Sequence, residues 1–181
     1  VPECVVISPN DPAVMVRFAS ECRDLGYPYV FDPGQSIPNI SGEDMVASIK
    51  GAMLTIGNDY ELEMIRSKTG MSPQDLLELT PLVVVTLGEK GARLITRDEE
   101  VSVSAIAPRQ LADPTGAGDA YRAGLVVALL RGCDLRTAGQ IAALMGTYAI
   151  EQKGTQEHSF DLEQFAARYE GAWGAQLPAL A

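Results

Sequence analysis

The sequence has few of the residues that hold small or metal-dependent proteins together. Its 181 residues include 3 cysteines and 1 histidine, and Cys4, Cys22 and Cys133 form no C-x-x-C pair. This spacing favours neither a structural zinc site nor a disulfide framework. We therefore expect the cysteines to be buried small hydrophobic residues in a protein of the reducing cytoplasm. A chain of this length can bury a hydrophobic core that is stable without cross-links.

Positive charge and long apolar runs are scarce as well. Lys and Arg number 14 against 24 Asp and Glu, which gives a formal charge of −10 and disfavours nucleic acid or an anionic membrane as a partner. The longest apolar runs, residues 82–85 and 125–130, are too short to cross a bilayer. Any phosphate group that this protein binds must therefore be held locally, by backbone amides or by a metal ion.

Apolar runs alternate with helix signals along the first half of the chain. We expect strands over residues 4–8, 29–31, 53–56 and 82–86, and helices over residues 13–25, 41–50 and 58–69 and from residue 72. This alternation indicates a parallel sheet covered by helices. The later segments 91–96 and 101–106 resemble an antiparallel pair at the sheet edge. Three more helices are expected over residues 118–132, 134–153 and 161–171.

In an open parallel sheet, ligands bind outside the carboxyl ends of the strands. The residues that follow the expected strands are Asp32, Gly57 with Asn58, and Thr86 to Gly88. The sequence turns polar or glycine-rich at each of these points and again in the loop 113–119. We therefore expect these segments to form the ligand site together.

The stretch 113-DPTGAGD-119 places Gly116, Ala117 and Gly118 directly before a long apolar helix. Glycines let the backbone approach a phosphate closely at the positive end of a helix. No G-x-x-x-x-G-K-[ST] sequence is present, and G-x-G-x-x-G would require glycine at Tyr121. The stretch is therefore neither a Walker loop nor a Rossmann dinucleotide turn.

Two acidic residues of this stretch have two interpretations each. Asp119 can be a first-turn acid that complements the helix dipole, which contributes about 0.3–1 kcal/mol. It can also be the base that orients and deprotonates a hydroxyl attacking phosphorus, because a carboxylate without such a role would repel a phosphate. Asp113 fits an ordinary Asp-Pro turn. With Thr115 it equally offers oxygen ligands to a hard cation.

Asn58 and Glu61 have the spacing of a capping box, which is the simplest explanation of the pair. At the carboxyl end of a strand they also suit a hydrated Mg²⁺ near nucleotide phosphates. The segment 86–92, with Gly88 and Gly91, is explained most simply as a hairpin turn. His158 has no acidic or cysteine partner pattern around it, and we assign it no catalytic role.

The stretch 113–119 resembles the C-terminal signature D-x-T-G-A-G-D of the PfkB family, the ribokinase-like sugar and nucleoside kinases. Further matches follow the family's order: Phe31-Asp32-Pro33, Asn58-x-x-Glu61 and Thr86-Leu87-Gly88-x-x-Gly91. The resemblance implies a three-layer ribokinase-like α/β fold with a mostly parallel sheet, an antiparallel edge hairpin and helices on both faces. It also implies ATP-dependent phosphorylation of a hydroxymethyl group.

The resemblance implies a role for each residue of the signature loop. Asp119 would take the proton from the acceptor hydroxyl. The amides of Gly116, Ala117 and Gly118 would form the anion hole for the phosphoryl group in transfer. In members that a monovalent cation such as K⁺ activates, Asp113 and its loop supply oxygens to that cation.

The remaining roles implied by the resemblance concern nucleotide and metal binding. Asn58 and Glu61 would organise Mg²⁺ and the phosphates of ATP, and the segment with Thr86, Gly88 and Gly91 would lie beside the nucleotide. The residues that would join Asp113 in the cation site are Thr115 and the backbone near Ala149 and Gly154. His158 stands where a small polar residue is frequent in the family.

The resemblance also bears on which acceptor substrate is phosphorylated. Segments 8–12, 32–38 and 151–158 look most like the adenosine-kinase-like branch, which implies a nucleoside, adenosine first, before a sugar. A ribokinase- or fructokinase-type sugar kinase is an alternative. A nucleotide-binding module without catalysis and a purely structural α/β domain are two more.

The resemblance covers nearly all of this chain but only about the C-terminal half of a usual family member. For this reason, and because no methionine precedes Val1, we expect a fragment or a proteolysed chain: the C-terminal portion of one kinase domain, which carries the nucleotide site and the catalytic base. The missing N-terminal half would supply the lid, a possible homodimer contact, and most acceptor-binding residues. We expect this half-chain to be inactive alone, since a cut through a parallel sheet exposes strand edges.

Overall fold

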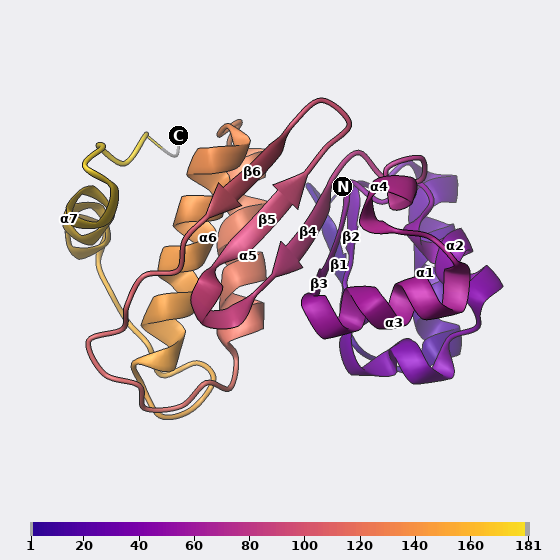
Figure 1. Cartoon of the computed structure of the whole chain (residues 1–181), viewed down its shortest axis with the longest axis horizontal. Helices are drawn as coiled ribbons and strands as arrows, with labels where there is room; N and C mark the ends of the chain where they lie inside the picture. The colour runs from indigo at the N-terminus through magenta and orange to yellow at the C-terminus, as the bar shows by residue number, and fades with distance from the viewer. Residues whose placement is uncertain (1, 180–181) are drawn as a thin grey trace. The chain divides into compact units, whose positions relative to one another are not determined.

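The computed structural model describes residues 2–179, which form two compact units (Figure 1). The first unit contains the chain up to Leu87 together with Arg93–Val101. The second contains Gly88–Ala92 and the chain from Ser102 onward. Val1, which was a second reason to expect a fragment, lies outside the described residues. No helix within residues 2–179 combines the length and the hydrophobicity that a membrane span requires.

Parallel strands in chain order form the sheet of the first unit. They are β1 (Val5–Ile7), β2 (Tyr29–Phe31), β3 (Leu54–Asn58) and β4 (Val83–Thr86), each parallel to the next. The 6-stranded sheet continues with the hairpin strands β5 (Ala92–Ile95) and β6 (Glu100–Val103). The predicted mostly parallel sheet with an antiparallel edge hairpin is confirmed.

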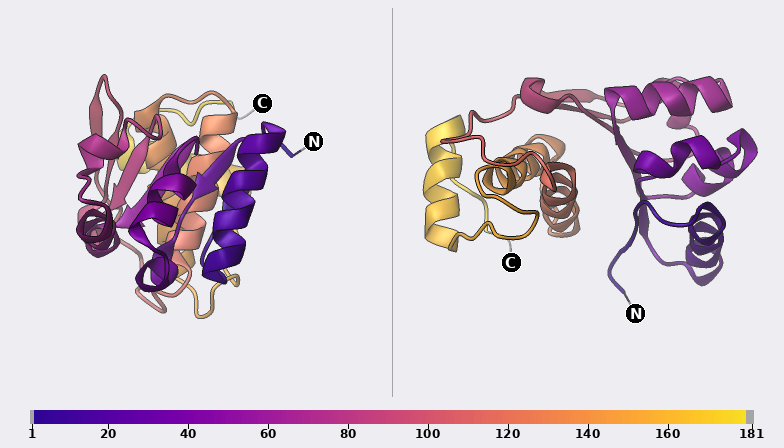
Figure 2. Two further views of the ribbon diagram at one scale, coloured as in Figure 1. Left: turned by 90° about the vertical axis from the view of Figure 1, so that its right-hand side faces the viewer. Right: turned by 90° about the horizontal axis from the view of Figure 1, so that it is seen from below.

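Helices α1 (Pro12–Leu25), α2 (Gly42–Ile49) and α3 (Asp59–Thr69) cover one face of the parallel strands (Figure 2). The buried side chains Met15, Met45 and Ile65, one from each helix, pack in the same hydrophobic core as Tyr29 and Phe31 of β2. A short helix α4 (Pro73–Leu76) and the 3₁₀ helices η1 (Gly34–Asn39) and η2 (Gly88–Lys90) complete the connections.

Local sequence signals explain where these helices begin and end. The Asp11 side chain accepts the amide of Val14 at 3.1 Å, and Pro12 takes the first helical position of α1, where its missing N–H does no harm. Gly26 ends α1 in the left-handed conformation, with φ of 68°. These boundaries agree with the prediction to within a residue.

The second unit is helical, with α5 (Ala117–Leu130), α6 (Leu135–Ile150) and α7 (Leu162–Trp173). Helices α5 and α6 lie side by side (Figure 1), and Gly124 permits their close approach. A Cβ atom at Gly124 would lie 2.7 Å from Met145 Cγ and 3.1 Å from the Cα of Ala142. The rings of Tyr148 and Phe165 stack 5.9 Å apart and connect α6 to α7.

Some predicted boundaries of strands and helices are wrong. Strand β3 continues past Ile56 because Gly57 and Asn58 still pair with β4. Helix α6 ends at Ile150 rather than at residue 153, because the chain turns at Glu151. Strand β6 spans Glu100–Val103 rather than 101–106.

One element was not predicted, and one prediction needs correction. The residues between β2 and α2, for which no element was expected, form the 3₁₀ helix η1, which buries Ile37. The cysteines are free, as expected, yet only Cys22 is buried, whereas Cys4 and Cys133 are half-buried. Cys4 directly precedes β1 and Cys133 directly precedes Asp134, the N-cap residue of α6, so both lie at the ends of these elements rather than in the core.

Candidate active site

The carboxyl ends of β3 and β4 bring two predicted site residues together. Asn58 and Thr86 are register partners at the ends of these strands. Asn58 is exposed and Thr86 is half-buried, so both can be reached from solvent. Asp32 follows β2 directly at the same edge of the sheet. The residues expected at the carboxyl edge of these strands therefore lie at one edge of the sheet in the first unit, and their role in binding a ligand stays a prediction.

Asn58 and Glu61 form the capping box that their spacing predicts. Asn58 Oδ1 accepts the amide of Glu61 at 2.8 Å, and Glu61 Oε2 accepts the amide of Asn58 at 2.8 Å. Gly57 makes room for this return, because a Cβ there would lie 3.2 Å from Glu61 Oε2 and 2.7 Å from Leu62 Cδ2. The simpler interpretation of the pair is thus confirmed, and Glu61 Oε1 takes no part in it.

Asn58 and Glu61 can hold Mg²⁺ only through bound water molecules. No group of three or more His, Cys, Asp or Glu residues within residues 2–179 is arranged to hold a metal ion. Mg²⁺ commonly keeps several waters and binds one or two carboxylates together with substrate phosphates. Glu61 with Asn58 fits that pattern, whereas a closed protein cage for the metal is not formed by the described residues.

Gly91 is explained by the turn rather than by a ligand. Its φ is +95°, and a Cβ would lie 2.0 Å from the carbonyl oxygen of Val103. Gly88 also has a positive φ, of +58°, but a Cβ there would meet nothing within 4 Å. Both glycines thus follow from local backbone geometry. Their place beside a nucleotide stays a prediction.

The loop 113–119 belongs to the second unit and is shaped by Asp113 and Gly116. Asp113 Oδ1 accepts the amide of Thr115 at 2.9 Å, which is an Asx-turn. Gly116 has a left-handed φ of 86°, and a Cβ there would lie 3.1 Å from the carbonyl oxygen of Thr155. The ordinary turn interpretation of Asp113 is therefore correct, and Gly116 is required by both conformation and packing.

The first turn of α5 leaves two amides without acceptors. No side chain caps the helix at Gly116. The amide of Ala117 donates to the carbonyl of Pro114 at 3.3 Å, and within the described chain no acceptor is found for the amides of Gly118 and Asp119. A Cβ on Gly118 would meet nothing within 4 Å. Neither packing nor dihedral strain explains why this position is glycine.

Asp119 lies in this first turn, with 73% of its side chain exposed. Its Oδ1 accepts a hydrogen bond from Arg122 Nη2 at 2.5 Å, one turn further along α5. The neighbouring Tyr121 is buried, and desolvation raises the pKa of its hydroxyl well above the ordinary value. Tyr121 therefore stays protonated, and Asp119 is the residue of this turn that can act as a base.

The loop is attached to the end of α6. The carbonyl of Ile150 accepts the amides of Ala112 at 2.9 Å and of Asp113 at 3.2 Å, and the amide of Gly154 donates to Asp113 Oδ2 at 3.2 Å. The pKa of Asp113 is lowered by its hydrogen bonds, those with Thr115 first and that from Gly154 next. The two segments expected to surround a monovalent cation therefore meet.

The oxygen atoms around Asp113 can be compared with the ligands that the expected monovalent cation needs. Both carboxylate oxygens accept backbone amides, and the carbonyl that meets the loop belongs to Ile150, next to the expected Ala149. Thr115 is exposed, and its amide already donates to Asp113. Oxygen ligands are present for a hard cation, so the residues fit, and K⁺ stays a prediction.

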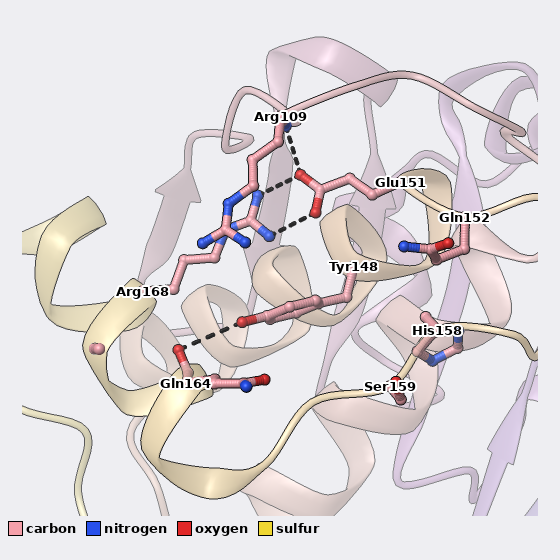
Figure 3. Close-up of a pocket in the computed structure, with 9 residues that line it drawn as sticks. Arg109, Tyr148, Glu151, Gln152, His158, Ser159, Gln164 and Arg168 are labelled. Atoms are coloured by element: carbon pink, nitrogen blue, oxygen red, sulfur yellow. Dashed lines mark hydrogen bonds and ion pairs between the residues drawn. The ribbon is translucent and has the colours of Figure 1, made fainter.

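A buried ion pair that the sequence did not predict lies at the end of α6, where the loop 113–119 is attached. Glu151 and Arg168 have 8% and 10% of their side chains exposed, and Arg168 donates to both Glu151 oxygens, at 2.5 and 2.7 Å (Figure 3). The Arg109 amide also donates to Glu151, at 2.5 Å, and the Tyr148 ring lies 4.7 Å from the Arg168 guanidinium carbon. Residues far apart in sequence thus clamp the segment that leads into the loop.

Charge and burial act in opposite directions on Glu151. Desolvation raises the pKa of its carboxyl, but the hydrogen bonds from Arg168 and from the Arg109 amide outweigh that effect, so the pKa is lowered overall. Glu151 and Arg168 line a pocket of about 490 Å³, and His158 lines it as well. The Nδ1 atom of His158 is buried and has no hydrogen-bond partner in the described chain. No sequence periodicity links these positions, so only their spatial proximity reveals the network.

Comparison with known proteins gives a consistent result. Residues 3–161 match the family described as pfkB family carbohydrate kinase. A nucleoside kinase of Methanothermobacter thermautotrophicus is 36% identical over 175 residues, which are 96% of this chain and 56% of that protein. The chain therefore spans little more than half the length of that relative.

Solved structures show the same relationship. The structure of Burkholderia thailandensis nucleoside kinase in complex with inosine has a TM-score of 0.93 and 34% identity, covering 96% of this chain and 57% of that one. Methanocaldococcus jannaschii nucleoside kinase, an archaeal member of the ribokinase family, has a TM-score of 0.88 and 31% identity, covering 93% and 56%. These similarities confirm the predicted ribokinase-like α/β fold. The chain belongs to the pfkB family of carbohydrate kinases.

Proposed function

We propose that the intact protein is an ATP-dependent kinase that phosphorylates a hydroxymethyl group of a nucleoside. The observation that carries this proposal is the first turn of α5, where the unpaired amides of Gly118 and Asp119 lie beside an exposed carboxylate. Such amides, at the positive end of a helix, bind and stabilise a phosphoryl group. This chain would be the C-terminal portion of one kinase domain, with the nucleotide site and the base.

The residues of the loop suggest how the transfer proceeds. Asp119 takes the proton of the acceptor hydroxyl while that oxygen attacks the γ-phosphorus of ATP. The bond from the γ-phosphorus to the β,γ-bridging oxygen breaks, and its electron pair leaves with ADP. Amides at the start of α5, among them that of Gly118, stabilise the negative charge on the transferring group. Positioning and electrostatics therefore supply the catalysis.

Nucleotide and ion binding would rest on the remaining residues. Asn58 and Glu61 would hold Mg²⁺ through water, and the metal supplies charge neutralisation between the β- and γ-phosphates when bound. The segment with Thr86, Gly88 and Gly91 would lie beside the nucleotide. Asp113, Thr115 and backbone oxygens near Gly154 would hold K⁺. A cytoplasmic location, expected from the cysteine pattern, and a homodimer, expected from the family resemblance, complete the proposal.

The acceptor class follows from the relatives. Nucleoside kinases are the most similar proteins reported above, and one of them was solved with inosine. Another structure of the Burkholderia enzyme holds ADP-inosine. Segments 32–38 and 151–158, which resemble the adenosine-kinase-like branch, favour adenosine. We therefore propose a purine nucleoside, with adenosine and inosine as the first candidates.

An acceptor panel tests this function. The intact protein is incubated with Mg-ATP and adenosine, inosine, ribose or fructose, and ADP formation is followed together with the ³¹P NMR signal of the phosphorylated product. We expect a nucleoside 5′-phosphate, with kcat/KM for the nucleoside at least about 100-fold above that for either sugar. A preference for ribose or fructose would favour the sugar-kinase alternative. Mg-ATP binding without turnover of any acceptor would favour a non-catalytic module.

A further inference from the structure

The segment 109–113 is hydrogen-bonded to the end of α6 along its length. The amide of Arg109 donates to Glu151 Oε1 at 2.5 Å, and Gln110 Nε2 donates to the backbone carbonyl of Glu151 at 3.0 Å. Two later amides of the segment donate to the carbonyl of Ile150, at 2.9 and 3.2 Å. Among these contacts, the one acceptor that belongs to a side chain is the Glu151 carboxylate.

The Glu151 carboxylate is itself held in one direction. Arg168 of α7 donates to both of its oxygens, at 2.7 Å to Oε2 and at 2.5 Å to Oε1, so Oε1 accepts the Arg109 amide and the guanidinium together (Figure 3). The glutamate side chain is 8% exposed and the arginine side chain 10%. A buried carboxylate whose oxygens both bind a planar guanidinium cannot rotate without breaking charge-assisted hydrogen bonds. The place of the Arg109 amide is therefore set by α6 and α7 through this pair.

Regular structure does not fix the segment. Residues 104–114, between β6 and the turn that begins α5, form neither helix nor strand. A connecting segment of this kind is held by its few tertiary hydrogen bonds, so the loss of one of them lets it move. The loop that follows carries the exposed carboxylate of Asp119 and the amide of Gly118, which has no acceptor in the described chain. A shift of about 1 Å in such groups can lower a rate about 100-fold.

We propose that Glu151 is a positioning residue, which holds the Arg109 amide and thereby sets the place of the loop 113–119 for phosphoryl transfer. This inference rests on the proposed kinase function, since it assigns the loop to that reaction. In this role Glu151 neither takes the proton of the acceptor nor contacts the phosphoryl group. It acts through the backbone of the segment 109–113, so its effect on turnover must follow the hydrogen bond to Arg109 and not the stability of the fold.

Two variants at position 109 separate this hydrogen bond from the ion pair. Arg109→Pro removes the amide proton and leaves Glu151 and Arg168 in place. Arg109→Ala keeps the amide and removes the side chain of this exposed residue, so it is the matched control. In the intact protein, Arg109→Pro should lower kcat about 10- to 100-fold, with the KM for Mg-ATP changed less than about 2-fold, because geometry is lost and not nucleotide binding. Arg109→Ala should keep kcat within about 2-fold of wild type.

A double variant separates positioning from stability. Glu151→Gln keeps an oxygen that can accept the Arg109 amide but leaves the Arg168 charge buried, so it should lower the melting temperature and keep kcat within about 3-fold of wild type. Glu151→Leu combined with Arg168→Met replaces the buried pair by apolar side chains, so it should melt above Glu151→Gln. Its Arg109 amide has lost the acceptor, and kcat should fall about 10- to 100-fold when both are assayed below their melting temperatures. The more stable of the two variants is thus the less active one.

Hydrogen exchange measures the cause independently of turnover. The Ala112 and Asp113 amides should exchange at least about 10-fold faster in Arg109→Pro, and in the double variant, than in Arg109→Ala. A lower kcat with unchanged exchange would refute the positioning role, and so would a kcat that returns to wild type in the double variant. If Arg109→Pro keeps wild-type kcat while Asp119→Asn abolishes turnover, the positioning role is refuted and the kinase function stands. If the wild-type protein phosphorylates no acceptor, the kinase function fails, and the role that rests on it fails with it. Melting temperatures identify any variant that does not fold, and if Arg109→Pro is one, the comparison of Glu151→Gln with the double variant decides.

Discussion

Gly118 makes an unusual prediction: its replacement by alanine should stabilise the protein and inactivate it. The residue lies in the first turn of α5, its φ is not in the left-handed region, and an added Cβ would meet nothing within 4 Å. Alanine is more favourable than glycine in a helix by about 0.5–1 kcal/mol. Gly118→Ala should therefore raise the melting temperature by about 1–4 °C.

The loss of activity has a separate cause. Each Cα–Cβ bond of a helix tilts toward the helix N-terminus, so the new methyl group would occupy the space in front of the Gly118 amide. A phosphoryl oxygen could then no longer approach that amide. Loss of one such donor lowers kcat by about 100- to 1,000-fold. In the proposed function, glycine at this position lowers the stability of the fold but leaves the anion site open.

The assay compares thermal melting and nucleoside phosphorylation for wild type, Gly118→Ala and a matched control. Gly171 is also a glycine in a helix, α7, and a Cβ there would also meet nothing within 4 Å. Gly171→Ala should give a similar stabilisation with unchanged kcat. If Gly118→Ala is stabilised and fully active, no phosphoryl group approaches this amide, and the reasoning from open space to function is refuted.

The buried ion pair and the hairpin turn allow further predictions. Glu151→Gln leaves Arg168 buried without its charge partner and should lower the free energy of unfolding in urea by about 3–5 kcal/mol; a loss below about 1 kcal/mol would contradict the burial of the pair. Because the folded state lowers the pKa of Glu151, its stabilising contribution is present above the unfolded-state pKa and lost as pH falls through the folded-state value. Wild type should consequently lose more stability on acidification than Glu151→Gln does, and parallel curves would contradict this. Gly91→Ala should destabilise by more than the about 1–2 kcal/mol of left-handed strain alone, because its Cβ would lie 2.0 Å from the Val103 carbonyl oxygen. Gly88 is also left-handed, but a Cβ there would meet no atom within 4 Å, so Gly88→Ala should cost only the strain. If urea titrations show the same loss of unfolding free energy for both variants, the clash at Gly91 is refuted.

Local signals in the sequence were sufficient for most of the fold. The helix expected over residues 13–25 is α1 to within a residue, and the Asn58-x-x-Glu61 spacing predicted a capping box that the structure contains. The strand Tyr29–Phe31 was predicted to the residue. These features depend on neighbours within one helical turn or strand, so a short stretch of sequence determines them.

Contacts between segments far apart in the chain could not be predicted from the sequence. The clamp of Glu151 and Arg168 joins the end of α6 to α7, and its Arg109 contact comes from a loop far upstream. The clash that requires glycine at position 91 arises from the backbone of Val103 across the hairpin. None of these pairs has a sequence period, because folding and not spacing brings them together. The proposed role of Gly118 is the reverse case, because it is inferred from the open space around the position.

The most direct test of the proposed function is the effect of Asp119→Asn on phosphoryl transfer from ATP to adenosine or inosine in the intact protein. Asparagine keeps the shape of the side chain but cannot accept the acceptor proton. The account predicts a decrease in kcat of about 100- to 10,000-fold, with an unchanged melting temperature and an unchanged Kd for Mg-ATP. Near-wild-type transfer by a correctly folded Asp119→Asn variant would contradict the account.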